Sequence, residues 1–256
     1  MDRVLAVPNF SISVLPADLG LGPEVALHYA RGDVDHGRSV VAFSGKPKDV
    51  LASLVALTAR ILEAADLSTH VGVHPRIGAV DVAPFVDLVG DRAEAVAGLY
   101  ADHLRDLGIP ALAYERSSPG GRTLPELRRA AGPGHPKWGA TVVGARGFLI
   151  AANLDFPADL RIEVANAART IRQRRDAGDP ALVGVRALAF DLRSRGEVQL
   201  SFNLTRPDET SFDAVAAIGE SLVGASAGGT ELIGVIRQRD LAGAARLTVD
   251  PSQIVD

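Results

Sequence analysis

The stretch VRALAFDLRSRGEVQLSFNL, residues 185–204, decides the fold of the second half of this chain. Two apolar, β-favouring segments, 185–192 and 197–204, flank a short polar linker that contains glycine, which predicts an antiparallel hairpin. Four further elements flank this pair: a strand at 148–154, a helix at 159–175, a helix at 211–224 and a strand at 231–236. The order β-α-β-β-α-β is typical of a ferredoxin-like, split-βαβ sheet with both helices on one face.

The first half of the chain predicts a separate α/β unit. Apolar residues recur along one side of the segment from Pro47 to Asp66, as expected of an amphipathic helix. The other predicted elements are strands at 4–10, 37–45, 78–89 and 109–115 and a helix at 91–108. A glycine- and proline-rich segment, 116–139, follows them. We therefore expect an α/β (α+β) protein of two subdomains, 1–140 and 141–256, with a ligand groove between them.

Composition restricts the kinds of chemistry that are available. The chain has 256 residues, of which 47% are apolar, enough to fill two cores, and it has no cysteine. Disulfides, thiolate nucleophiles and Cys-ligated zinc are thereby excluded. A net charge of −4 argues against a general nucleic-acid surface. No apolar run approaches the roughly 20 residues that span a bilayer, and the N-terminus lacks a signal pattern, so we expect a cytoplasmic protein without a membrane partner.

The segment HVGVHPRIGAVDV, residues 70–82, concentrates residues that can do chemistry. His74 precedes a proline, which restricts its backbone to extended geometry. Arg76 can bind a carboxylate through two parallel hydrogen bonds. Asp81 enters an otherwise apolar strand, where a carboxylate needs a partner or a function. Such a loop is suited to acid-base chemistry on a bound anion.

The residues of this loop allow two other interpretations. His70 and His74 have the spacing of metal ligands on one helix face, but Gly72 and Pro75 argue against a helix, and no second ligand pattern accompanies them. We therefore expect no metal. The loop can also be a plain helix-to-strand connection whose polar residues are incidental, and the residue types alone leave that interpretation open.

Four segments resemble, in order, the glutamate formiminotransferases. They are VPNFS at 7–11, HVGVHPRIGAVDVAPF at 70–85, WGATVVGARGFLIAANLD at 138–155 and GEVQLSFNLT at 196–205. The resemblance implies an enzyme of histidine breakdown that transfers the formimino group of N-formimino-L-glutamate to N5 of tetrahydrofolate, its co-substrate. It also implies a homodimer. In animals this activity is fused to a cyclodeaminase, and we expect that second activity to be absent here.

The resemblance also implies roles for individual residues. The histidine before Pro-Arg, His74, is the expected proton shuttle, because imidazole has an ordinary pKa of about 6.5. Asp35 is expected to pair with the cationic formimino group, although Asp33 or a simple Asx turn remain alternatives. Arg76 and Arg146 are the expected ligands of the glutamate carboxylates, with exposed surface arginines as the alternative. Asp81 completes the predicted substrate site.

Folate is expected to contact the glycine- and proline-rich segment that ends in Trp-Gly. Trp138 can pack on a ring of the folate, but it can equally belong to the protein core. The predicted folate-binding residues are Gly134, His135, Pro136, Lys137, Trp138 and Gly139.

The chain departs from the family pattern at two places. The family reads VPNFSEGR, whereas this chain reads VPNFSISVLP, and Val73 stands where the family has a glutamate before the catalytic histidine. The loss of two acidic residues changes the pKa expected for His74 and the handling of a cationic substrate. Two alternatives therefore stay open: formyl transfer between a reduced folate and glutamate, and noncatalytic folate binding.

Overall fold

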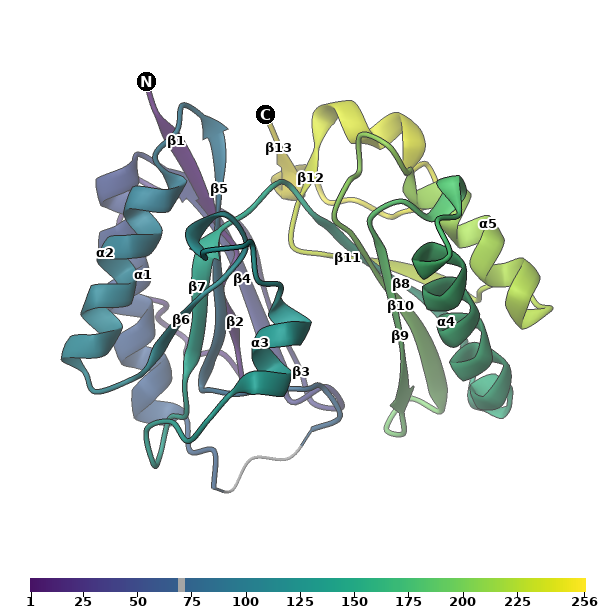
Figure 1. The fold of residues 1–256 in the computed structure, drawn as a ribbon, viewed down its shortest axis with the longest axis horizontal. Coiled ribbons are helices and arrows are strands. Elements are labelled where there is room, and N and C mark those ends of the chain that lie inside the picture. The colour runs from purple at the N-terminus through teal and green to yellow at the C-terminus, as the bar shows by residue number, and fades with distance from the viewer. Residues whose placement is uncertain (69–71) are drawn as a thin grey trace. The chain divides into compact units, whose positions relative to one another are not determined.

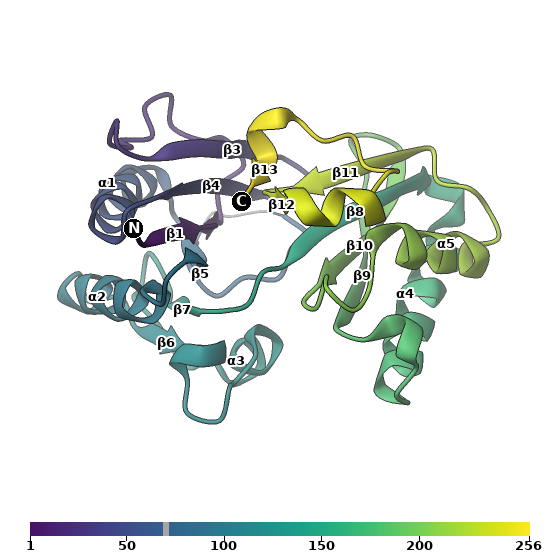
Figure 2. The same cartoon turned by 90° about the horizontal axis from the view of Figure 1, so that it is seen from above.

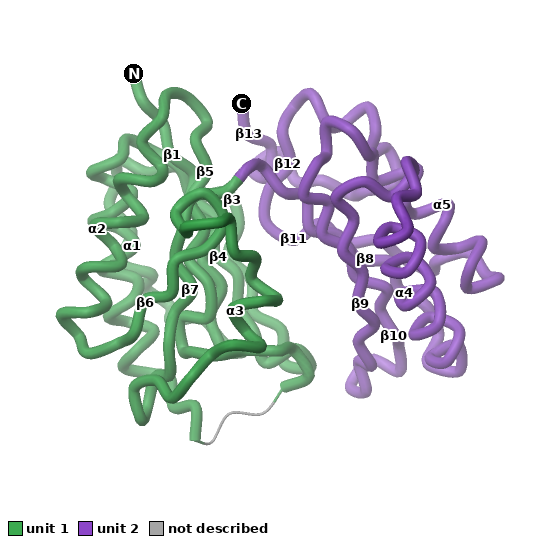
Figure 3. The backbone as a smooth tube through the Cα atoms, in the orientation of Figure 1, with its two compact units in different colours: residues 1–146 green, residues 147–256 purple. Residues whose placement is uncertain are grey.

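The computed structural model describes residues 1–68 and 72–256, which form two compact units (Figure 3). The division lies between Arg146 and Gly147. Strand β7 (Thr141–Ala145), which follows the predicted boundary at residue 140, pairs with strands of the first unit. None of the described helices is long and apolar enough to cross a membrane.

The first unit is built on a sheet of seven strands (Figure 1). In spatial order these are β3, β4, then β1 and β2 in one shared position, then β5, β7 and β6. Pairing is antiparallel from β3 to β5 and parallel from β5 to β6. The bounds are β1 (Arg3–Ala6), β2 (Asn9–Phe10), β3 (Ala26–Asp33), β4 (Arg38–Gly45), β5 (Val80–Val89) and β6 (Ala111–Ala113).

Helices α1 (Pro47–Ala64) and α2 (Ala93–Asp106) cover one face of this sheet, and α3 (Leu124–Ala130) covers the other (Figure 1). Successive residues of a strand point to opposite faces. Accordingly Val143 belongs to the core beneath α1 and α2, whereas its neighbour Val142 packs with Leu127 of α3. The α3 face of the sheet is the one that carries the site described below.

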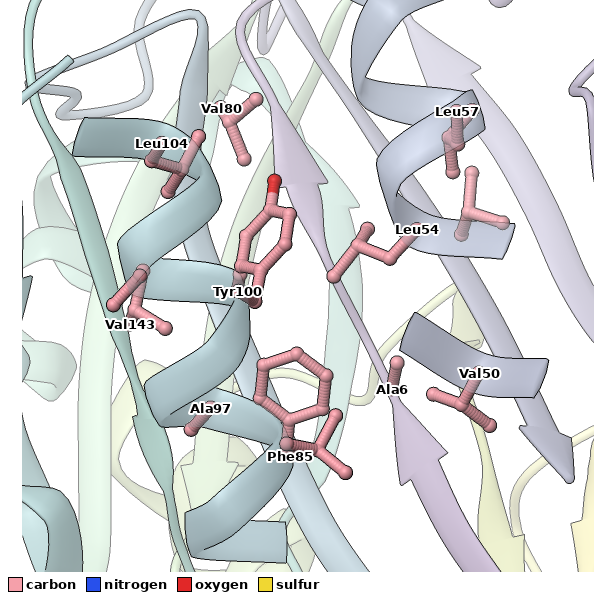
Figure 4. Packing of buried hydrophobic residues seen from close by; sticks show 14 of the residues in the cluster. Ala6, Val50, Leu54, Leu57, Val80, Phe85, Ala97, Tyr100, Leu104 and Val143 are labelled. Atoms are coloured by element: carbon pink, nitrogen blue, oxygen red, sulfur yellow. The ribbon is translucent and has the colours of Figure 1, made fainter. Parts of the chain in front are cut away.

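The core between the sheet and the two long helices is filled largely by apolar side chains. Tyr100 of α2 points toward Val80 and Leu54 (Figure 4), and its ring meets the edge of Phe85 at a centroid distance of 6.0 Å. The Tyr100 hydroxyl forms a 2.6 Å hydrogen bond with Thr58 of α1. Burial raises the pKa of Tyr100, so this hydroxyl stays neutral and serves the packing of α1 against α2.

The second unit confirms the predicted split-βαβ sheet (Figure 2). Its four strands lie in the order β11-β8-β10-β9, and every neighbouring pair is antiparallel. The bounds are β8 (Ile150–Pro157), α4 (Arg161–Asp176), β9 (Val185–Leu192), β10 (Glu197–Leu204), α5 (Phe212–Val223) and β11 (Gly229–Ile233). Leu154 and Leu200 of the sheet share one core with Val164 of α4 and Val215 of α5, so both helices lie on the same face.

Several strands differ from those that the sequence predicts. The predicted strand at 4–10 is wrong as a single element, because it is divided into β1 and β2, and the strand predicted at 109–115 covers only 111–113. The sequence pattern predicts neither β3, an edge strand with exposed residues, nor the short β7. The predicted strand at 231–236 is wrong as a single element, because Gly234 adopts a left-handed backbone with φ 82°. This turn separates β11 from β12 (Ile236–Arg237), which pairs in parallel with β13 (Ile254–Val255).

Candidate functional site

A β-bulge at the start of β5 places Asp81. Val82 pairs with Asn9, and Val80 pairs with Phe10, so Asp81 is the extra residue between two consecutive partners. A bulge re-aims the side chain of the residue that it inserts. The Asp81 side chain is fully buried and binds residues of β4 and α3.

Within the described part of the chain, Asp81 accepts hydrogen bonds from two guanidinium groups and one backbone amide. Its Oδ2 atom accepts from Nη1 of Arg38, at 2.8 Å, and from Nη2 of Arg128. Its Oδ1 atom accepts from the backbone N–H of Ile77 at 2.8 Å. The buried carboxylate thus has the partners that its position demands. A direct contact of Asp81 with substrate stays a prediction.

Arg38 connects Asp81 to the predicted catalytic histidine. Its Nη1 atom lies 2.9 Å from Nδ1 of His74, and its Nε atom donates to Oδ1 of Asn9 at 3.0 Å. The sequence alone does not identify Arg38, Arg128 or Asn9 as residues of this site. The one signal for Arg38 was a charged residue at the head of an otherwise apolar strand. We call Arg38, His74, Asp81 and Arg128 the arginine–histidine cluster.

The loop that carries His74 lies against the turn between β3 and β4. The backbone N–H of Val73 donates to the carbonyl of Asp35 at 3.1 Å, and that of His74 donates to the carbonyl of His36 at 3.4 Å. A Cβ atom on Gly72 would lie 2.5 Å from the same His36 oxygen, so the close approach requires glycine. The structure thereby brings the predicted residues Asp35 and His74 into adjacent segments.

Within that turn, Asp33 has a structural role. Its Oδ1 atom accepts from the backbone N–H of His36, three residues on, at 2.8 Å, a local side-chain-to-backbone hydrogen bond that fixes the turn. This observation fits the preference for Asp35 over Asp33 as the residue that faces the substrate. That role of Asp35 stays a prediction.

The environment of His74 is cationic. Burial, followed by the charges of Arg38 and Arg128, lowers the pKa of His74 to about 2, while its contact with the Pro75 carbonyl opposes this shift. The pKa of His74 in the ligand-free protein thus lies well below the ordinary imidazole value. The two nearby guanidinium groups disfavour a positive charge on the ring, so the imidazole is neutral. Position 73, next to it in the chain, is valine and supplies no negative charge to offset them.

The two arginines predicted to bind carboxylates occupy different places. Arg76 donates through Nη1 to the carbonyls of Gly72 and His74, at 3.2 and 3.1 Å, and so supports the loop. Arg146 and Asp81 lie at opposite ends of the ladder between β5 and β7. Asp81 comes just before the first residue pair of this ladder, and Arg146 comes just after the last residue pair. About 16 Å of strand separates the backbone of Arg146 from that of Asp81, given about 3.3 Å per residue. The structure thus brings Arg76, but not the backbone of Arg146, to the cluster.

The predicted folate segment forms a compact loop beside the start of β5. Gly139 and His135 exchange two backbone hydrogen bonds. The loop is also tied to the segment before β5: the N–H of Ala140 donates to the carbonyl of Ile77, and the N–H of Ala79 donates to the carbonyl of Trp138. A Cβ atom on Gly139 would lie 2.2 Å from the Ile77 carbonyl oxygen. This loop also contains Gly134, Pro136 and Lys137.

Trp138 is half-buried at the edge of the core. Its indole Nε1 donates to the carbonyl of Leu62, in the last turn of α1, at 3.1 Å. The ring of His135 stacks on it, with centroids 4.4 Å apart. The core and ligand interpretations of Trp138 are compatible, because one edge is fixed by α1 while part of the side chain stays accessible.

Among residues 1–68 and 72–256, no group of three His, Asp or Glu side chains could hold a metal ion. The alternative site built on His70 and His74 is not tested, because His70 lies outside the described residues. The cluster can instead do two things chemically. Its guanidinium groups can bind an anion, and its imidazole can exchange a proton with whatever lies beside that anion.

Comparisons with known proteins point in one direction. Residues 5–134 match the family described as the formiminotransferase domain, N-terminal subdomain. The chain is similar to the glutamate formimidoyltransferase of Thermoplasma acidophilum, with 29% identity over 82% of this chain and 79% of the other. It is also similar to the formimidoyltransferase-cyclodeaminase of Gallus gallus, with 28% identity over 98% of this chain. The chain spans about half the length of that relative, 53%.

Proposed function

The chain belongs to the formiminotransferase family, and we propose that it transfers the formimino group of N-formimino-L-glutamate to tetrahydrofolate. One observation carries this proposal: the segment that matches the family holds His74 next to the turn of Asp35 and in contact with Arg38, which shares Asp81 with Arg128. A glutamate derivative brings carboxylates that suit guanidinium groups. Tetrahydrofolate is the co-substrate, and no metal is needed.

The reaction exchanges one carbon–nitrogen bond for another. N5 of tetrahydrofolate forms a bond to the formimino carbon, and the bond from that carbon to the glutamate nitrogen breaks. N5 loses one proton and the glutamate nitrogen gains one. A single group that takes up this proton and returns it balances the step, and we assign this work to His74.

Formyl transfer between a reduced folate and glutamate is the second candidate. The arginine–histidine cluster contains two guanidinium groups and one carboxylate. A neutral formyl group is opposed less by this positive charge than a formiminium cation is. Val73 and the missing glutamate after VPNFS favour the same alternative. A noncatalytic folate-binding protein is the third candidate, and the homodimer and cytoplasmic location expected from the sequence remain predictions.

A comparison of donors separates these candidates. Purified protein is incubated with tetrahydrofolate and either N-formimino- or N-formyl-L-glutamate, and the folate product and free glutamate are quantified. We expect turnover with the formimino donor that is lost in His74→Gln. Faster turnover with the formyl donor would replace the first proposal by the second. If folate binds saturably but neither donor is turned over, the third candidate, a noncatalytic folate-binding protein, is the one that remains.

A further inference from the structure

Two polar neighbours of the Nδ1 atom of His74 require opposite proton states. Nη1 of Arg38 lies 2.9 Å away, and so does the carbonyl oxygen of Pro75. A guanidinium group can only donate a hydrogen bond, and a carbonyl can only accept one. Nδ1 can therefore form a hydrogen bond with only one of these two neighbours at a time.

The choice of partner decides what the other ring nitrogen of His74 can do. When Arg38 donates to Nδ1, the single proton of the neutral ring sits on Nε2, which can then act only as a donor. When Nδ1–H donates to Pro75, Nε2 carries the lone pair that a base needs. Removal of a proton from an attacking amine requires the second state.

Arg38 and Arg128 have capacity for an additional anion. Nη1 and Nε of Arg38 are engaged by Asp81, His74 and Asn9. Among the described residues, none accepts a hydrogen bond from Nη2 of Arg38, and the buried Nε of Arg128 likewise has no partner. Two guanidinium charges thus face one carboxylate, which favours a further carboxylate.

We propose that Arg38 receives a carboxylate of the ligand, and that this carboxylate draws Arg38 away from Nδ1 and thereby switches His74 to the tautomer with a basic Nε2. The identity of the ligand as a glutamate derivative rests on the proposed function. The position of the proton on His74 can be measured independently of that function.

The charges around His74 agree in sign with this mechanism. Arg38 and Arg128 face the ring from β4 and α3, and His36 lies in the adjacent turn, with ring centroids 6.2 Å apart. Arg76 donates to the His74 carbonyl, and Asp81 is the buried counter-charge of the cluster. The cations that lower the pKa of His74 are the ones that a bound carboxylate would offset.

The test reads the proton position directly. The full chain is labelled with ¹⁵N-histidine, and the two ring nitrogens of His74, assigned with His74→Gln, are followed at neutral pH by two-bond ¹H–¹⁵N correlation. The probe is glutarate, a dicarboxylate with the carbon chain of glutamate, and the matched control is the neutral diamide glutaramide. No folate is present.

We expect the proton on Nε2 in the free protein and on Nδ1 with saturating glutarate, and no change with glutaramide. In Arg38→Met the proton should sit on Nδ1 with or without glutarate, and glutarate affinity measured by calorimetry should fall roughly 10- to 100-fold, as expected for a lost charge-assisted contact. Arg38→Lys should keep part of that affinity. Arg60→Met, which removes an arginine of a surface ion pair, should behave as the wild type.

Three results would overturn the inference: a proton on Nδ1 in the free protein, glutarate binding that leaves it on Nε2, or no binding of glutarate. A purely structural Arg38 would leave the tautomer unchanged in a folded Arg38→Met protein. If the tautomer switches while formimino transfer is absent, the inference stands and the proposed function fails. If formimino transfer occurs while the tautomer of His74 does not switch, the proposed function stands and the inference fails.

Discussion

His74 and Arg38 are in direct contact, with 2.9 Å between Nδ1 of the imidazole and Nη1 of the guanidinium. The familiar arrangement of a catalytic histidine, in which a carboxylate accepts the proton of Nδ1, is therefore absent from this pair. Asp81 instead holds Arg38, which in turn holds the ring. The histidine is neutral before a ligand binds, and several measurable consequences follow from that state.

Replacing the imidazole should abolish most of the activity. His74→Gln removes the group that exchanges the proton, and turnover should fall by roughly 10²- to 10⁴-fold, the usual contribution of a positioned acid-base group. Steady-state assays with either donor measure this loss. His103→Gln, in the last turn of α2, is the matched control and should keep turnover near the wild-type value. Equal activity of the two variants would remove His74 from the mechanism.

Removing the buried carboxylate should destabilise the fold. Asp81→Asn leaves Arg38 and Arg128 without their counter-charge, and breaking a buried ion pair from one side costs about 3–5 kcal/mol. The free energy of unfolding in urea measures this effect. Asp18→Asn, at a surface ion pair with Arg60, should have a far smaller effect. A stable Asp81→Asn protein would mean that the cluster does not need its negative charge.

Stability should fall in mild acid because of His74. Above its ordinary pKa of 6.5 the imidazole is neutral in both the folded and the unfolded chain, so it adds no pH dependence. Below 6.5 the unfolded chain takes up a proton, which the folded chain refuses until about pH 2, so the unfolded state binds more protons and stability falls.

Urea unfolding of the wild type and His74→Gln, compared at about pH 7 and about pH 5, isolates this contribution. The wild type should lose more stability than the variant over this interval. Parallel losses in the two proteins would show that the folded-state pKa of His74 is close to its ordinary value.

The single tryptophan provides a reporter of folate binding. If Trp138 contacts the ligand, tetrahydrofolate should quench its emission saturably, because no other indole contributes. Trp138→Leu should then weaken folate binding by roughly 2- to 10-fold beyond the effect of lost area. It should also lose the hydrogen bond to Leu62, worth about 1 kcal/mol of unfolding free energy. If tetrahydrofolate does not quench the emission and Trp138→Leu mainly destabilises the protein, Trp138 is a core residue that does not contact folate.

The sequence allowed prediction where a pattern is local. The apolar stripe of α1 and the hairpin of β9 and β10 follow from side-chain periodicity, and both are confirmed. The partners of His74 are not local, because Arg38 lies 36 residues away along the chain and Arg128 approaches from a separate helix. The bulge at Asp81 depends on a one-residue shift in pairing with β2, which periodicity within β5 alone does not encode.

The most direct test of formimino transfer follows the atoms that move. N-Formimino-L-glutamate is synthesised with ¹³C at the formimino carbon and ¹⁵N at its imino nitrogen, and the folate product is analysed by mass spectrometry after a single turnover. The proposed reaction predicts both labels in the folate and unlabelled nitrogen in the released glutamate. Labels that appear in formamide or ammonia instead, or that stay on the glutamate derivative, would contradict it.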